Sequence, residues 1–174
     1  MSGTYLIILR FIHIVASVCW AGGGFTFFLF IEPTAKSLAP MGMQFIQYMV
    51  TKRRFSIFMV IFSTLTLISG TLLLWKRAGG RWNDYLSTGP GLMFTIGSVV
   101  GVVVYLIGML GVNPRALKLA KYGNEIQASG GTPTPAQGAA LHRLDKELSV
   151  LSLADFALVA LSLALMASAR YWVF

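Results

Sequence analysis

The chain has 174 residues, of which 56% are hydrophobic and 11% are charged, whereas soluble globular domains carry about 25% charged residues. This composition excludes an ordinary soluble domain, because the surplus apolar surface has to face lipid. Lys and Arg outnumber Asp and Glu by 14 to 6, but an excess spread over membrane loops sets orientation and attracts anionic lipid. We therefore expect no nucleic-acid partner. The single cysteine, Cys19, excludes a disulfide within the chain.

The first apolar segment covers residues 5–33 and has no Asp, Glu, Lys or Arg between Phe11 and Ile31. At ~1.5 Å of rise per residue, such a helix crosses a hydrocarbon core of ~30 Å. It is longer than the apolar region of a cleavable signal peptide, which has about 7–15 residues. We expect a retained membrane span that ends at Pro33, because proline disfavours a helical conformation for the residue before it.

Three more apolar segments predict spans at residues 55–75, 92–112 and 148–173. The connection between the first two spans predicts a loop or a short surface helix. Its larger apolar residues recur at helical spacing beside a basic run, a pattern typical of a helix in the membrane interface. These residues are Met41, Phe45, Tyr48 and Met49, and the run is Lys52, Arg53 and Arg54.

The longest polar segment lies between the third and fourth spans. Residues 113–128 predict a short helix, with Asn and Pro as its cap and first residue and Ser-Gly-Gly after its end. Thr134 and Gln137 have the spacing of a capping box, so a new helix should start at Pro135 and run into the fourth span. The sequence therefore predicts an all-α fold. It is an integral membrane four-helix bundle, one transmembrane domain over residues 1–174, with a cytoplasmic helical hairpin between spans three and four.

The distribution of Lys and Arg predicts the orientation. Five lie on the side of the termini and nine on the side of the two larger loops. The positive-inside rule then predicts that the larger loops face the cytoplasm and that both termini lie outside.

His13 is the only histidine within a predicted span, and it is the first candidate for chemistry. A neutral imidazole at this depth can ligate heme iron, a chlorophyll magnesium or copper, or it can form a hydrogen bond between helices. Arg10 precedes it by one turn and Trp20 follows by two turns, so both are candidate cofactor-binding residues. His142 lies outside the spans, so a second heme ligand would have to be a methionine or His13 of another copy. The methionine candidates are Met59, Met93, Met109 and Met166.

Other intramembrane residues have two interpretations each. Asp155 is the only acid clearly inside a span, and it either bonds to a hydroxyl of another span or belongs to a proton or substrate path. The hydroxyl candidates are Ser63, Thr64 and Ser69. Arg10 and Arg170, near one boundary, either extend to lipid phosphates or hold a carboxylate or propionate beside His13.

Glycines in two spans predict close contact between helices, because small residues let backbones approach in lipid. The candidates are Gly22, Gly23 and Gly24 in the first span and Gly97, Gly101 and Gly108 in the third. Close approach of a flat cofactor to the first group remains open.

The first span, HIVASVCWAGGGFTFFLFIEP, and the stretch from NPRALKLAKYGNEIQASGG to the last helix resemble uncharacterised four-span bacterial membrane proteins of the copper-resistance protein D-like group. More distantly, the first helix is similar to that of small heme-containing bacterial protoporphyrinogen oxidases. These resemblances imply a four-span fold in the cytoplasmic (inner) membrane of a bacterium, and metal or heme handling. This chain departs from them, since it has no His-rich or Met-x-x-Met cluster and no charged residue or histidine in spans two and three.

The sequence has no nucleotide-binding loop, no zinc-ligand spacing and no nucleophile with a base and an orienting acid. We expect a non-enzymatic integral membrane protein, an accessory or assembly subunit of a larger membrane complex such as an energy-transducing one. Its partners would be the lipid bilayer and other membrane subunits or further copies of itself. The alternative is a redox or metal-handling membrane protein that binds heme or copper through His13.

Overall fold

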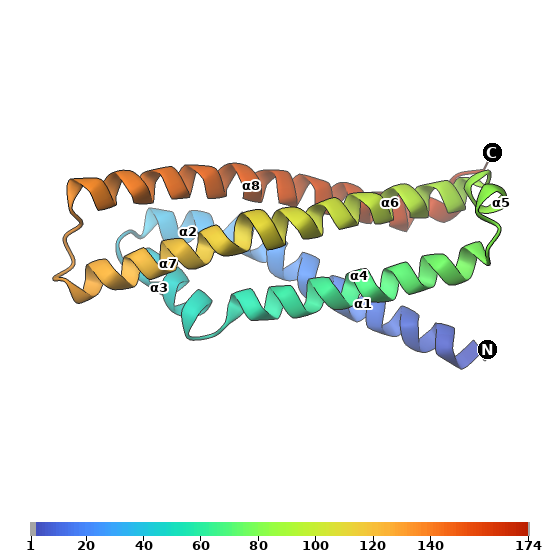
Figure 1. The fold of residues 1–174 in the computed structure, drawn as a ribbon, viewed down its shortest axis with the longest axis horizontal. Helices are drawn as coiled ribbons and strands as arrows, with labels where there is room; N and C mark the ends of the chain where they lie inside the picture. Colours follow the sequence, from blue (N-terminus) through green and yellow to red (C-terminus); the bar gives the residue numbers. More distant parts are fainter. Residues whose placement is uncertain (1–2, 174) are drawn as a thin grey trace. The chain divides into compact units, whose positions relative to one another are not determined.

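The computed structural model describes residues 3–173, and every regular element in that range is helical (Figure 1). Four helical stretches are long and apolar enough to cross a membrane, namely Gly3–Ser37, Phe55–Ala78, Gly89–Ala128 and Pro135–Tyr171. They confirm the predicted all-α fold with four candidate spans. Between 11% and 17% of their most apolar windows is buried inside the protein, which leaves the rest for contact with lipid.

The stretches divide into eleven elements, three of which are not α-helices. In chain order they are α1 (Gly3–Thr26), η1 (Phe27–Ile31), α2 (Glu32–Ser37), α3 (Met41–Thr51), α4 (Phe55–Ala78), α5 (Trp82–Leu86), α6 (Gly89–Leu106), η2 (Ile107–Val112), α7 (Asn113–Ala128), α8 (Pro135–Ser168) and η3 (Ala169–Tyr171). The wide π-helical turns η1 and η2 and the short 3₁₀ helix η3 are the exceptions.

The predicted end of the first helix at Pro33 is wrong, because the helix continues to Ser37. Proline in an α-helix lacks an N–H and its ring collides with the carbonyl four residues earlier. Here the turn before it widens into η1, in which the backbone N–H of Glu32 bonds to the carbonyl of Phe27, five residues back. This π-helical turn absorbs the proline without ending the helix.

The same correction applies to Pro114. Asn113 was predicted to cap a separate helix, but it has helical backbone angles, and its N–H bonds to the carbonyl of Gly108, five residues back in η2. Helix α7 is therefore continuous with α6 through a second π-helical turn. Residues 33–39 and 114–120, which follow the two turns, share Pro, Ala, Leu and Ala at the same four offsets.

Contacts between residues divide the chain into two compact units, although a single domain was predicted. Unit 1 comprises residues 1–22, 61–105 and 157–174, of which the terminal residues 1, 2 and 174 lie outside the described range. It is a bundle of four helical segments joined in pairs by hydrogen bonds. Those bonds link α1 to α4 (His13 to Thr66), α4 to α6 (Thr64 to Tyr105) and α8 to α6 (Ser162 to Gly97).

Unit 2 comprises residues 23–60 and 106–156. The ring of Phe156 on α8 packs against Phe25 and Phe28, with ring centroids 5.0 and 4.8 Å away. The ion pair between Arg115 and Glu147, at 2.9 Å, joins α7 to α8. These contacts give the polar hairpin its own packing.

The predicted surface helix forms as α3. Gly42 faces the backbone of Ala35 so closely that an added Cβ would lie 2.2 Å from the Ala35 carbonyl oxygen, so only glycine fits there. On the other side, Met41, Phe45 and Tyr48 are exposed. The helix is therefore amphipathic, with an outward apolar face as the sequence indicated.

The start of α8 confirms the predicted capping box. The backbone N–H of Thr134 donates to Oε1 of Gln137 over 2.9 Å, and the backbone N–H of Gln137 donates to Oγ1 of Thr134 over 3.3 Å. Helix α8 then runs without interruption from Pro135 to Ser168. The single helix predicted from the polar hairpin into the fourth span is thus confirmed.

Candidate ligand site around His13

His13 lies in the middle of the α1 segment of unit 1 and is anchored to α4 through one ring nitrogen. Nδ1 lies 3.0 Å from the carbonyl oxygen of Thr66 and 3.3 Å from Oγ of Ser69. A carbonyl oxygen can only accept a hydrogen bond, so Nδ1 carries the hydrogen. Nε2 is then the nitrogen of the neutral ring that has a free lone pair.

The imidazole of His13 packs against helix α4 at Gly70. A Cβ added to Gly70 would lie 2.8 Å from Cε1 of His13, so the ring occupies the space that any other side chain would fill. The neighbouring hydroxyls donate back to their own helix, Thr66 to Phe62 and Ser69 to Leu65, over 2.8 and 2.6 Å. Both hydroxyl groups are satisfied within α4, which leaves the Thr66 carbonyl to hold the ring.

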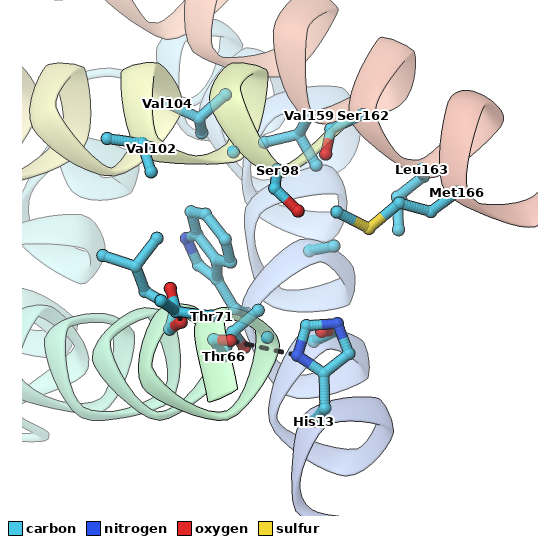
Figure 2. A pocket seen from close by; sticks show the side chains of 16 residues that line it. His13, Thr66, Thr71, Ser98, Val102, Val104, Val159, Ser162, Leu163 and Met166 are labelled. Carbon is cyan, nitrogen blue, oxygen red and sulfur yellow. Dashed lines mark hydrogen bonds between the residues drawn. The ribbon is translucent and has the colours of Figure 1, made fainter. Parts of the chain in front are cut away.

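His13 borders two cavities within unit 1. The first, which we call the small cavity, has a volume of about 60 Å³ and is lined by side chains of α1, α4, α6 and α8 (Figure 2). The second, the basic cavity, has a volume of about 200 Å³. Four residues line both cavities, namely His13, Gly70, Ser98 and Met166.

The three cofactor-binding candidates lie around these cavities. Trp20 lines the small cavity and Arg10 lines the basic cavity, with His13 between them. Of the four candidate methionines, Met166 lines both cavities, and Figure 2 shows it at the small cavity. Met93 is buried in unit 1 without lining either cavity, and the remaining two belong to unit 2.

Asp155 belongs to unit 2, where its Oδ1 is buried and has no hydrogen-bond partner among the described residues. A Cβ on Gly108 would lie 3.8 Å from this oxygen. Ser69, one of the hydroxyl partners considered for Asp155, instead bonds within unit 1. A buried carboxyl oxygen without a hydrogen-bond partner is expected where the group exchanges protons or binds a further polar partner.

The glycines of the two spans have different surroundings. Gly97 lies against Met166, whose Cγ would be 3.0 Å from an added Cβ, and Gly101 lies 3.7 Å from Oγ of Ser162 by the same measure. Gly23 and Gly24 face Met59 at 3.3 and 3.7 Å. Gly22 has nothing within 4 Å and is exposed.

Two other charged residues, Arg170 and Glu32, line neither cavity. The guanidinium group of Arg170 stacks on the ring of Tyr171, 4.7 Å from its centroid, and Arg170 lines neither cavity. Glu32, a residue of unit 2, pairs with Lys36 over 2.8 Å on α2.

Sequence reasoning missed the residues that α4, α5 and α6 contribute. Thr66 and Gly70 hold His13, and Arg77 and Tyr85 line the basic cavity. The available signal was the run STLTLISGT in the second span, which is rich in hydroxyls and contains a glycine. It has no ionisable residue, so it gave no reason to expect a histidine beside it.

Residues 3–173 contain no group of three or more His, Cys, Asp or Glu side chains placed to hold a metal ion. A metal at His13 would therefore need a thioether, a hydroxyl or an external ligand as its second partner. Comparisons of the chain with protein-family models, curated proteins and solved structures found no match.

Proposed function

We propose that this four-span membrane protein binds a copper(I) ion through Nε2 of His13, as a metal-handling protein. The observation that carries the proposal is the 3.0 Å hydrogen bond from Nδ1 to the Thr66 carbonyl. Histidines that ligate metals almost always donate their other ring N–H to a carbonyl or carboxylate, which fixes the tautomer and the ring orientation. The hydrogen bond leaves Nε2 as the ring's ligand atom.

The surroundings of His13 favour copper(I) over harder ions. Met166 lines the same two cavities, and thioether sulfur is a soft ligand that selects Cu(I). Asp and Glu, which suit hard cations, are absent among the described residues that line either cavity. The resemblance of the first and last spans to the copper-resistance protein D-like group points the same way.

Heme is another cofactor that the sequence leaves open, and it fits these cavities poorly. A cavity of about 150 Å³ holds one benzene ring, whereas the two cavities beside His13 have volumes of about 60 and 200 Å³. Four linked pyrrole rings exceed either volume. His142 cannot serve as a second ligand within unit 1, because it is an exposed residue of unit 2.

Anaerobic titration of detergent-purified protein with Cu(I), in competition with a chromophoric Cu(I) chelator, tests the proposal. We expect one ion per chain, with affinity reduced about tenfold or more in His13→Ala and reduced less in Met166→Leu. His142→Ala removes the other histidine of the chain and should leave binding unchanged. Equal binding by wild type and His13→Ala would refute the proposal, and a Soret band in protein from its native membrane would favour heme.

An accessory or assembly subunit is the second candidate function, favoured by the surroundings of Gly22. This glycine is exposed on α1 with nothing near it, beside the exposed Val15 and Val18. An exposed glycine in a membrane span lets a helix of another chain approach closely. We expect Gly22→Leu to dissociate a native complex on a non-denaturing gel, whereas Val18→Leu on the same face should not.

We also propose an orientation of the chain in the membrane. With nine of the fourteen Lys and Arg residues on the side of α3 and the α7–α8 hairpin, the positive-inside rule favours a cytoplasmic hairpin and external termini. The variants Gly131→Cys and Gly79→Cys, each made in a Cys19→Ser background, would test this orientation. A membrane-impermeant maleimide applied to intact cells should label position 79 and spare position 131.

A further inference from the structure

The basic cavity carries two guanidinium groups and no acidic side chain. Arg10 and Arg77 line it, and among its described lining residues there is no Asp or Glu. Within residues 3–173 neither arginine makes an ion pair. Two cations that converge on one cavity without a counter-ion create a site that attracts an anion.

Tyr85 of α5 adds an unsatisfied donor to the same cavity. Its hydroxyl is buried, lines the cavity, and has no hydrogen-bond partner of good geometry among the described residues. Burial raises the pKa of Tyr85, and the nearby charge of Arg77 opposes that rise. The phenol therefore keeps its hydrogen at neutral pH and can donate it. A buried donor without a partner is unfavourable, so an oxygen acceptor placed there would stabilise the site.

The guanidinium group of Arg77 is held beside the cavity, and Arg10 lines the same cavity. The guanidinium group of Arg77 lies over the ring of Phe94, 4.7 Å from its centroid, and Phe94 also lines the cavity. Stacking on an aromatic face keeps the planar N–H groups available at the guanidinium edge. Arg10 precedes His13 by three residues on α1, so both side chains lie on the same helix face.

The volume also suits a small charged group. At about 200 Å³, the cavity exceeds the ~150 Å³ that holds one benzene ring. A carboxylate or phosphate with a short attached chain fits within it. Because Arg10 and Arg77 are exposed residues of unit 1, such a group can arrive from the surface of the unit.

We propose that the basic cavity binds one oxyanion head group, a carboxylate or a phosphate, between Arg10 and Arg77 with the hydroxyl of Tyr85 as a third donor. The group belongs either to an anionic lipid or to a free small molecule. Anion binding does not require copper at Nε2 of His13, although His13 and Met166 also line the basic cavity.

Binding by metal-free protein in an uncharged detergent tests the site, with two probes that distinguish the sources. Inorganic phosphate and acetate, followed by calorimetry, report a free anion. Phosphatidylglycerol against phosphatidylcholine, followed by native mass spectrometry, reports a lipid head group. We expect saturable binding of at least one anionic probe and no preference for phosphatidylcholine.

Three variants and one control connect the binding to the cavity. Arg10→Gln and Arg77→Gln should each weaken the binding of the anionic probe about tenfold to a hundredfold, because each removes a charge-assisted hydrogen bond. Tyr85→Phe should weaken it less and leave the charge unchanged. Arg170→Gln removes an arginine of unit 1 that does not line the cavity, and it should bind as wild type does.

Circular dichroism and size-exclusion chromatography confirm that each variant remains folded. The proposal is overturned if no anionic probe binds the wild-type protein. It is equally overturned if Arg10→Gln and Arg77→Gln bind no more weakly than Arg170→Gln does.

Discussion

Gly70→Ala is the most direct test of how His13 is held. The added methyl group would lie 2.8 Å from Cε1 of the imidazole, so the ring has to move and its hydrogen bond to the Thr66 carbonyl is lost. Overpacking costs ~1–3 kcal/mol and the lost hydrogen bond about 1 kcal/mol. Replacing glycine by alanine in a helix returns about 1 kcal/mol. We expect Gly70→Ala to be less stable than wild type by about 1–3 kcal/mol.

Gly101→Ala is the matched control. Its added Cβ would lie 3.7 Å from Oγ of Ser162, an ordinary contact, so the variant should gain the helix propensity without a clash. Thermal unfolding of both variants in the same detergent gives the comparison, at about 2–4 °C per kcal/mol for a chain of this size. Gly70→Ala should also bind Cu(I) more weakly. A Gly70→Ala protein that melts with or above Gly101→Ala and binds copper normally would refute this account of the site.

Three further perturbations test the surrounding structure. Thr134→Ala should destabilise the first turn of α8 by about 1 kcal/mol, measured as faster amide hydrogen exchange at the residues that follow it. Ser162→Ala removes the 2.8 Å hydrogen bond from Ser162 to the Gly97 carbonyl and should cost about 0.6 kcal/mol in unfolding measurements. Glu147→Gln removes ion pairs with two arginines of unit 2. It should speed proteolysis of the loop at residues 129–134, as high salt should in the wild-type protein.

The features that the sequence predicted correctly depend on short stretches of chain. A span needs only an apolar run long enough to cross the bilayer, and all four runs form helices. The capping box of Thr134 and Gln137 uses residues three positions apart, and its hydrogen bonds form as expected. Local rules suffice where both partners lie within one turn.

The two wrong helix ends have one physical cause. Pro33 was taken to end a helix, because proline disfavours a helical conformation for the residue before it, and Pro114 was taken as the first residue of a new helix. At Pro33 and Pro114 the preceding turn widens into a π-helix, whose bonds reach back five residues. In lipid an interrupted helix would expose polar backbone groups, so a widened turn that keeps them bonded is favoured. Sequence rules calibrated on soluble helices do not include this option.

The partners of His13 could not be predicted, because they depend on how α1 and α4 are rotated against each other. Thr66 and His13 are 53 residues apart, and the second span contains no ionisable residue that would mark a polar face. A glycine among hydroxyl residues, as at Gly70, is common in membrane helices and says only that another helix comes close. The histidine in the first span could be identified in the sequence, but the residues of α4 that hold it, Thr66 and Gly70, could not.

The hydrogen bonding of the imidazole distinguishes a structural histidine from a ligand. A histidine that only joins two helices gains most when both ring nitrogens have protein partners. In unit 1 both hydrogen bonds of His13 converge on Nδ1, and the ring borders two cavities. Water in the small cavity could satisfy Nε2, since about 30 Å³ corresponds to one molecule. The thioether of Met166, which lines the same cavity, is a poor hydrogen-bond partner for water and a good ligand for Cu(I). We therefore assign Nε2 of His13 to a metal ion.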